Sequence, residues 1–175
     1  IRELAALTPG GYIHVGGDEA SSTTTADYVS FVSQVQAIVQ AHGKQMIGWE
    51  EIAQINGLSA TSVAQHWNLT DSFAPTAVQK GAKVLMSPAN KAYLDMKYYH
   101  KTSLGQTWAG LINTQTGYEW DPATIVAGVS GSSVLGVEAP LWTETIVTRS
   151  DMDYMAYPRL PGYAELGWSP VSGRN

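Results

Sequence analysis

The chain has 175 residues and a formal net charge of -5 at pH 7, and 44% of its residues are hydrophobic while 14% are charged. This composition suits a folded core rather than a disordered chain, and without a run of Lys or Arg it argues against nucleic acid as a partner. There is no cysteine, which excludes disulfides and thiolate chemistry. No stretch approaches the ~20 consecutive apolar residues of a membrane helix.

The first residues indicate a start inside a longer protein. Residues 1–7 have the composition of a helix that ends before Pro9 and Gly10-Gly11, and they lack the Met and the basic-then-apolar order of a signal peptide. Residues 12–15 are β-branched and bounded by glycines, which predicts a buried parallel strand that opens into a loop at Gly16-Gly17.

Strands and helices then alternate along the chain. Apolar residues recur at helical spacing over 28–39 and are followed by Gly43, which predicts a helix. The further predicted strands are 44–49, 62–67, 83–87 and 134–137, and the further predicted helices are 75–80, 122–129 and 152–167, the last interrupted near Pro158 and Pro161. Residues 93–116 show no sustained period and are expected to form a long functional loop. The alternation predicts an α/β fold with a parallel sheet, and more specifically part of a (β/α)8 TIM barrel.

Polar or aromatic residues follow each predicted strand. They are Asp18-Glu19, Trp49-Glu50-Glu51, His66-Trp67, Tyr93-Leu94-Asp95 and Trp142-Thr143-Glu144. Functional residues of barrels lie on the loops after the carboxyl ends of strands, so we expect these segments to converge on one site. The chain also has six Trp and nine Tyr but only two Phe, and aromatic rings with a polar edge suit surfaces that stack on sugars.

The adjacent carboxylates Asp18 and Glu19 suggest two separate tasks. The preceding glycines allow the strand to break, so the two side chains can reach different atoms of one substrate. Glycoside hydrolysis needs a proton donor and a negative group near the reacting carbon, and burial among tryptophans in a closed pocket would raise the pKa of Glu19 for the first task. The structural alternative is that Asp18 caps the following helix while Glu19 is merely exposed.

The string His14-Val15-Gly16-Gly17-Asp18-Glu19 after a strand resembles the active-site signature of glycoside hydrolase family 20. The resemblance continues in the family's order through Gly48-Trp49-Glu50-Glu51, Gln65-His66-Trp67, Tyr93-Leu94-Asp95 and residues 137–144. The resemblance is to bacterial, Streptomyces-like members of the family. The resemblance implies that residues 1–175 are the C-terminal part of a single catalytic (β/α)8 barrel domain and cover roughly strands 4 to 8.

The resemblance also implies a mechanism and roles for the site residues. In that family the sugar's own 2-acetamido carbonyl attacks the anomeric carbon, giving an oxazolinium intermediate and overall retention. By resemblance Glu19 is the general acid and then base, Asp18 orients the acetamido group, and Tyr93 donates its hydroxyl to the acetamido oxygen. The implied substrate-binding residues are the aromatic walls Trp49, Trp67 and Trp142, the hydroxyl acceptors Asp95 and Glu144, and Trp108 as a platform for the leaving sugar.

The implied substrate is an amino sugar, namely terminal β-linked N-acetylglucosamine or N-acetylgalactosamine, as in chitin degradation. No cofactor or metal is implied, and the full-length protein is expected outside the cell. A half-built barrel exposes two sheet edges, so self-association is expected as well. The alternative is a catalytically incomplete fragment, inactive as isolated or acting only as a carbohydrate-binding remnant.

Other conspicuous residues are expected to have structural roles. A metal site of His14, His66 and Asp18 would need a further ligand at suitable spacing, and His14 is instead expected to be a hydrogen-bonded residue that supports the acids. Trp120 and Trp168 lie away from the motifs and are interpreted as structural.

Three charged residues are likewise given ordinary interpretations. Glu50 and Glu51 are expected to be carboxylates at the start of a helix, near its positive dipole end. Arg159 is expected to hold the closing helix through a salt bridge.

Overall fold

A computed structural model describes residues 1–70 and 72–174. Its five strands form one parallel sheet in the sequential order β1-β2-β3-β4-β5. They are Tyr12–His14 (β1), Gln45–Trp49 (β2), Val63–His66 (β3), Lys83–Met86 (β4) and Val134–Val137 (β5). All five were predicted to within one residue at each end. A parallel sheet in chain order is the wall of a (β/α)8 barrel, and this confirms the predicted partial barrel.

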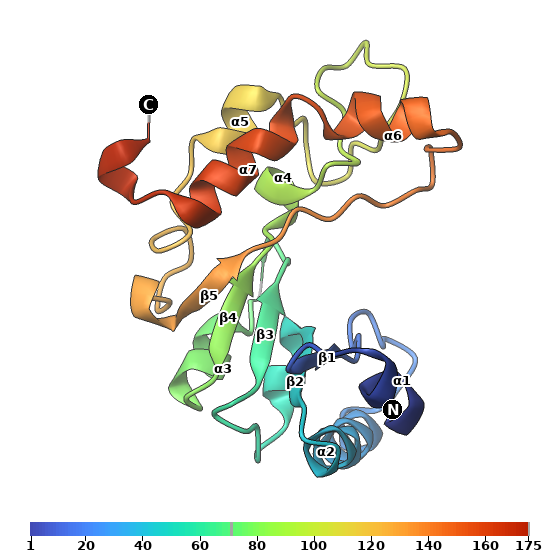
Figure 1. The fold of residues 1–175 in the computed structure, drawn as a ribbon, viewed down its shortest axis with the longest axis vertical. Coiled ribbons are helices and arrows are strands. Elements are labelled where there is room, and N and C mark those ends of the chain that lie inside the picture. Colours follow the sequence, from blue (N-terminus) through green and yellow to red (C-terminus); the bar gives the residue numbers. More distant parts are fainter. Residues whose placement is uncertain (71, 175) are drawn as a thin grey trace.

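Helices lie beside the sheet and beyond the carboxyl ends of its strands. They are Arg2–Leu7 (α1), Thr25–Ala41 (α2), Ala74–Gln79 (α3), Ala89–Ala92 (α4), Thr114–Tyr118 (α5), Arg149–Ala156 (α6) and Arg159–Trp168 (α7), with 3-10 helices Glu50–Gln54 (η1), Gly131–Ser133 (η2) and Val171–Gly173 (η3). Figure 1 shows α2 and α3 alongside the strands and α4 to α7 gathered beyond the ends of β3 and β4. Within the described ranges, no helix combines the length and the apolar character needed to cross a membrane.

Helix α2 packs on the sheet as its spacing predicted. Thr24 caps its first turn by accepting a backbone N–H three residues later. Tyr28, Val32 and Val39 are buried in a cluster that includes Met46 of β2. Because these residues recur every three to four positions, they lie on one side of the helix, and this stripe fixes α2 against the outer face of the sheet.

The prediction of a helix over residues 122–129 is wrong. That segment forms turns, with Gly128 at a φ of 83° and the Asp121 carboxylate accepting from the Ala123 N–H. Its apolar residues Ile125, Val126 and Val129 still pack into the core around β4 and β5, so burial is achieved without a continuous helix.

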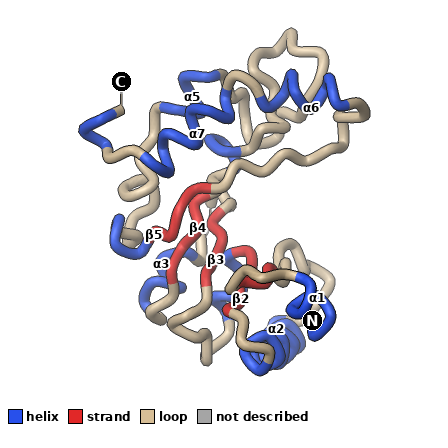
Figure 2. The backbone as a smooth tube through the Cα atoms, viewed as in Figure 1, coloured by secondary structure: helices blue, strands red, loops and turns tan. Residues whose placement is uncertain are grey.

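The predicted loop 93–116 is confirmed over most of its length, but α5 begins inside it. Asn113 starts that helix by accepting from the Thr116 N–H at 2.8 Å. Figure 2 shows the long loop segment between α4 and α5 running beside α6.

The closing helix is interrupted at one of the two prolines predicted to break it. Helix α6 ends at Ala156 and α7 begins at Arg159, so Pro158 falls in the break. Pro161 lies in the first turn of α7, where its missing N–H would have no helical partner, and it does not interrupt the helix. Trp120 packs into the core as expected, whereas Trp168 is 91% exposed and contributes no core packing here.

Arg159 does not form the predicted salt bridge with any described residue. The residue is 1% exposed, and its guanidinium lies 3.9 Å from the ring centre of Tyr98 and donates to four backbone carbonyls. The acceptors are Leu94, Met96, Ile112 and Met155. Because three of them belong to the long loop, Arg159 fixes that loop against the closing helices.

Candidate active site

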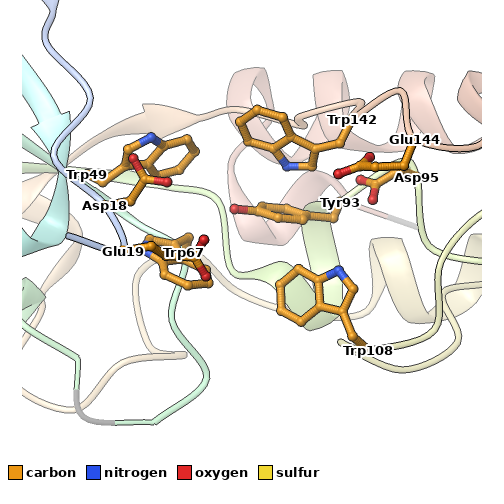
Figure 3. Close-up of a pocket in the computed structure, with 9 residues that line it drawn as sticks. All are labelled: Asp18, Glu19, Trp49, Trp67, Tyr93, Asp95, Trp108, Trp142 and Glu144. Carbon is orange, nitrogen blue, oxygen red and sulfur yellow. The ribbon is translucent and has the colours of Figure 1, made fainter. Parts of the chain in front are cut away.

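Nine side chains line one cavity of about 450 Å³ at the carboxyl ends of the strands. They are Asp18, Glu19, Trp49, Trp67, Tyr93, Asp95, Trp108, Trp142 and Glu144, all of which Figure 3 shows. The volume lies within the range of small-molecule sites, ~300–1,000 Å³. The structure therefore brings together every site residue predicted from the sequence.

The loop after β1 presents the carboxylate pair from a sharp turn. Its φ angles are 72° at Gly16, 105° at Gly17 and 49° at Glu19, which is the left-handed region. A Cβ on Gly17 would lie 2.9 Å from the Tyr28 hydroxyl oxygen, which donates to the Gly17 carbonyl at 2.7 Å. The Gly16 carbonyl accepts from the Trp49 N–H at 3.0 Å. The turn is thus tied to α2 and to β2.

Asp18 and Glu19 line the cavity, and both are exposed. Helix α2 is capped by Thr24, so the alternative in which Asp18 caps it is wrong. The burial expected for Glu19 among tryptophans is also not what the structure shows, because Glu19 is exposed. Figure 3 shows the pair at the end of the cavity that carries Trp49 and Trp67.

Five aromatic rings form a closed circuit around the cavity. Adjacent ring centres are 5.8 to 6.5 Å apart in edge or tilted contacts. The order is Trp49, Trp67, Trp108, Tyr93, Trp142 and back to Trp49. Such contacts stabilise ring pairs by about 1 kcal/mol each, so they also restrict how each ring can turn.

Tyr93 is the most enclosed ring of the circuit, at 3% exposure. Burial raises the pKa of its hydroxyl well above the ordinary value, and the charges of Asp95 and Asp18 raise it further. The hydroxyl therefore stays protonated and available as a donor. Figure 3 shows the phenol oxygen directed toward the side of the cavity that carries Asp18 and Glu19.

Asp95 has a buried carboxyl group with one oxygen available to accept a hydrogen bond. It is 2% exposed, and its Oδ1 has no hydrogen-bond partner among the residues that the structure describes. Burial raises its pKa to about 6, and the charge of Glu144 acts in the same direction, while Arg159 opposes the rise. An unpartnered buried acceptor is costly, so a cavity that contains one is suited to a ligand that brings a donor.

Glu50 and Glu51 start helix η1 as predicted, but their side chains have a further role. Glu50 is fully buried and accepts from His66 Nδ1, the N–H groups of Trp67, Asn68 and Ala74, and the Ser72 hydroxyl. Glu51 accepts from the indole Nε1 of Trp67 at 3.1 and 3.3 Å. Both carboxylates therefore hold Trp67 at the cavity wall. Two acids directly after a cavity tryptophan were the available sequence signal.

The two histidines once considered for a metal site have other partners. His14 Nε2 lies 3.0 Å from Gln65 Oε1, and its Nδ1 accepts from the Gly16 N–H, which confirms a hydrogen-bonded His14. His66 pairs with buried Glu50 at 3.0 Å. Among residues 1–70 and 72–174, no three His, Asp or Glu side chains gather to hold a metal ion.

Comparison with known proteins agrees with this geometry. Residues 21–171 match the family profile described as "Glycosyl hydrolase family 20, catalytic domain", a range that begins just after Asp18-Glu19. A β-N-acetylhexosaminidase of Cellulomonas fimi is 42% identical over 99% of this chain and 35% of its own length. A Porphyromonas gingivalis β-hexosaminidase is 30% identical over 100% of this chain and 25% of its own length.

Solved structures show the same likeness. The family 20 β-N-acetylhexosaminidase of Streptomyces coelicolor superposes with a TM-score of 0.94 at 46% identity, over 99% of this chain and 36% of the other. A mutant Streptomyces plicatus β-hexosaminidase, solved in complex with its product GlcNAc, has a TM-score of 0.94 at 47% identity, with the same coverage. The chain thus spans about a third of the length of the relatives it matches.

Proposed function

The chain belongs to glycosyl hydrolase family 20, and we propose that it carries most of the active site of a retaining β-N-acetylhexosaminidase. The proposed reaction removes a terminal, non-reducing β-linked N-acetylglucosamine or N-acetylgalactosamine. The observation that carries the proposal is that nine residues from the ends of five strands line one shared cavity.

The arrangement of carboxylates at the two ends of the cavity matches the arrangement of polar groups on the sugar. Figure 3 shows Asp18 and Glu19 at one end and Asp95 and Glu144 together at the other, with Tyr93 between them. In a pyranose, the anomeric carbon and the 2-acetamido group lie opposite the 4- and 6-hydroxyls. A sugar ring held by the aromatic circuit would therefore present its reacting end to the first pair and its hydroxyls to the second.

The proposed mechanism uses the substrate's acetamide as the nucleophile. Glu19 gives a proton to the glycosidic oxygen while the acetamido carbonyl oxygen bonds to the anomeric carbon, so the C–O bond to the leaving group breaks and a cyclic oxazolinium ion forms. Glu19, now ionised, then takes a proton from a water molecule that attacks the same carbon. The ring opens, the acetamide is regenerated, and the configuration is retained.

Asp18 and Tyr93 serve the acetamide in this proposal. The Asp18 carboxylate accepts from the acetamido N–H and offsets the positive charge that spreads over the oxazolinium ring. The Tyr93 hydroxyl donates to the carbonyl oxygen and holds it close to the anomeric carbon. The raised pKa of Tyr93 supports this role, because the phenol has to remain protonated to donate.

A second candidate is a catalytically incomplete chain that keeps the residues but not a working site. The chain's share of about a third of its relatives' length and the exposure of Glu19 favour this candidate for the 175-residue chain alone. Asp95 and the aromatic circuit would then support sugar binding without turnover.

Release of nitrophenol from 4-nitrophenyl N-acetyl-β-glucosaminide tests the proposal. It is measured with this chain and with a longer protein, which contains this chain and has the full length of its relatives. The matched control is 4-nitrophenyl β-glucoside, which lacks only the acetamide. Release from the first substrate alone by the longer protein supports the proposal, and activity there but not in the 175-residue chain supports the second candidate as well. Equal rates on both substrates would contradict the assisted mechanism.

A further inference from the structure

A network of hydrogen bonds crosses the inner side of the sheet beneath the cavity. His14 Nδ1 accepts from the Gly16 N–H at 3.1 Å, and His14 Nε2 lies 3.0 Å from Gln65 Oε1. Gln65 is fully buried and its Nε2 donates to Ser87 Oγ at 2.9 Å and to Glu138 Oε1 at 2.8 Å. This hydrogen-bond network therefore links the loop after β1 to Gln65 of β3 and to the residues that follow β4 and β5.

We propose that His14 is a positioning residue, held as a neutral imidazole with its proton on Nε2, which fixes the Gly16 peptide from which the carboxylate pair extends. The positioning of that pair matters for turnover only if the proposed function holds. The protonation state of the ring is a separate statement, and it follows from the hydrogen bonds alone.

The hydrogen bonds at both nitrogens of the His14 ring specify the same tautomer. A backbone N–H can only donate, so His14 Nδ1 has to offer a lone pair to Gly16. At the other end, the Gln65 NH₂ donates to Glu138 and to Ser87, which leaves the Gln65 carbonyl oxygen to face His14 Nε2. The reverse amide orientation would place two oxygens 2.8 Å apart. His14 Nε2 therefore has to donate, and the ring carries one proton.

The same bonds fix a peptide that has few other means of staying in place. Gly16 has a φ of 72° and no side chain, and its carbonyl accepts from the Trp49 N–H. With its own N–H bound to His14, both polar groups of Gly16 are tied. The His14 ring also contacts the Trp49 ring edge-on at 5.5 Å, so one imidazole orients the turn and touches the cavity wall. A small shift of reacting groups can reduce turnover strongly.

Nitrogen NMR on the 175-residue chain with labelled histidine tests the tautomer. The chain has four histidines, and the signal that disappears in His14→Asn belongs to His14. At pH 7 we expect a protonated Nε2 and an unprotonated Nδ1. In Gln65→Met, which keeps the size but removes the acceptor, we expect the same tautomer, because the Gly16 N–H still requires a lone pair on Nδ1. A doubly protonated ring, or a proton on Nδ1, in the unmodified protein would overturn the proposal.

Turnover of the longer protein tests the positioning. We expect His14→Ala to lower kcat about tenfold or more with little change in KM. His14→Asn should recover kcat to within about threefold of wild type, because an Asn oxygen can accept from the N–H two residues later as an Asx turn does. His42→Asn, an exposed histidine at the end of α2, is the control and should leave kcat unchanged. Equal losses in His14→Asn and His14→Ala would contradict the positioning role. An inactive wild type would contradict the proposed function instead, and the NMR result would still decide the tautomer.

Discussion

The indole Nε1 of Trp67 donates to both carboxylate oxygens of Glu51, at 3.1 and 3.3 Å. The carboxyl is partly buried, and burial raises its pKa above the ordinary value, with the charges of Glu50 and Asp18 acting in the same direction. Trp67 contacts two other rings of the aromatic circuit, so its orientation affects the whole wall of the cavity.

Removing the Glu51 carboxylate should make the Trp67 wall of the cavity more mobile, and it should disturb Asp18 and Glu19 less. We expect Glu51→Ala to raise KM several-fold with a smaller effect on kcat, because the Trp67 indole loses its partner. Glu51→Gln keeps a carbonyl acceptor and should stay close to wild type. Steady-state kinetics on the N-acetyl-β-glucosaminide and Trp67 mobility by fluorine NMR of 5-fluorotryptophan check this. A Glu51→Gln variant as impaired as Glu51→Ala would indicate that charge, not the hydrogen bond, matters.

The carboxylate pair should have separable and large effects on turnover. We expect Glu19→Gln and Asp18→Asn in the longer protein each to lower kcat by at least about a hundredfold. Glu19→Gln should lose least on substrates with a good leaving group, since such groups need little proton donation. Glu3→Gln on α1, at an exposed residue that does not line the cavity, is the control. Rates like those of wild type in either variant would contradict the assigned roles.

The strands and the cavity could be predicted because each left a local signal. Short strand-like runs that alternate with helical segments marked the strands, and the polar or aromatic residues after them had to meet at one edge of a parallel sheet. The helix expected over 122–129 failed because its apolar residues are buried through turns, which composition does not distinguish from a helix. The location of the protein, its domain assignment and its self-association stay predictions.

The supporting contacts were harder to predict than the cavity itself. Arg159 was expected to meet a carboxylate, but the long loop turns its carbonyls inward and supplies the acceptors. Glu50 starts a helix as expected, but the end of β3, the loop after it and the start of α3 also surround its carboxylate and donate five hydrogen bonds. Such contacts depend on the path of a loop in space, which periodicity does not specify.

The raised pKa of Asp95 predicts a dependence of binding on pH. The carboxyl has a pKa of about 6, mainly because it is buried. Above that pH it is ionised and accepts strongly from sugar hydroxyls, and below it the protonated form accepts less well. We therefore expect KM to rise as pH falls from 7 to 5. In Asp95→Asn, KM should be higher at pH 7 and nearly constant over this range. A parallel rise of KM in both proteins would assign the effect to another group.

Arg159 should be important for stability and for the long loop. Arg159→Met keeps much of the side-chain volume but leaves four backbone carbonyls without their donor. Because each unsatisfied buried acceptor costs ~1–3 kcal/mol, we expect the free energy of unfolding to fall by about 3 kcal/mol or more. Urea unfolding followed by tryptophan fluorescence measures this. Arg149→Met, at an exposed arginine of α6, is the matched control and should change little.

Glu50 should link stability to pH in the acid range. Although burial acts to raise the pKa of Glu50, the hydrogen bonds and charge of His66 and the bonds from Ser72 and Asn68 lower it below the ordinary 4.5. A carboxyl whose pKa is lowered by folding stabilises the folded state above its unfolded pKa, and this contribution is lost as pH falls through the folded value.

We therefore expect the free energy of unfolding to decrease as pH is lowered from about 5 toward 3. Glu50→Gln turns an NH₂ group toward donors, and breaking a buried pair in this way costs about 3 kcal/mol at pH 7. The same variant should show a weaker dependence on pH, because the titrating group is gone. Asp153→Asn, which removes an exposed partner of Arg149, should keep the wild-type profile. A Glu50→Gln profile parallel to that of wild type would place the acid sensitivity elsewhere.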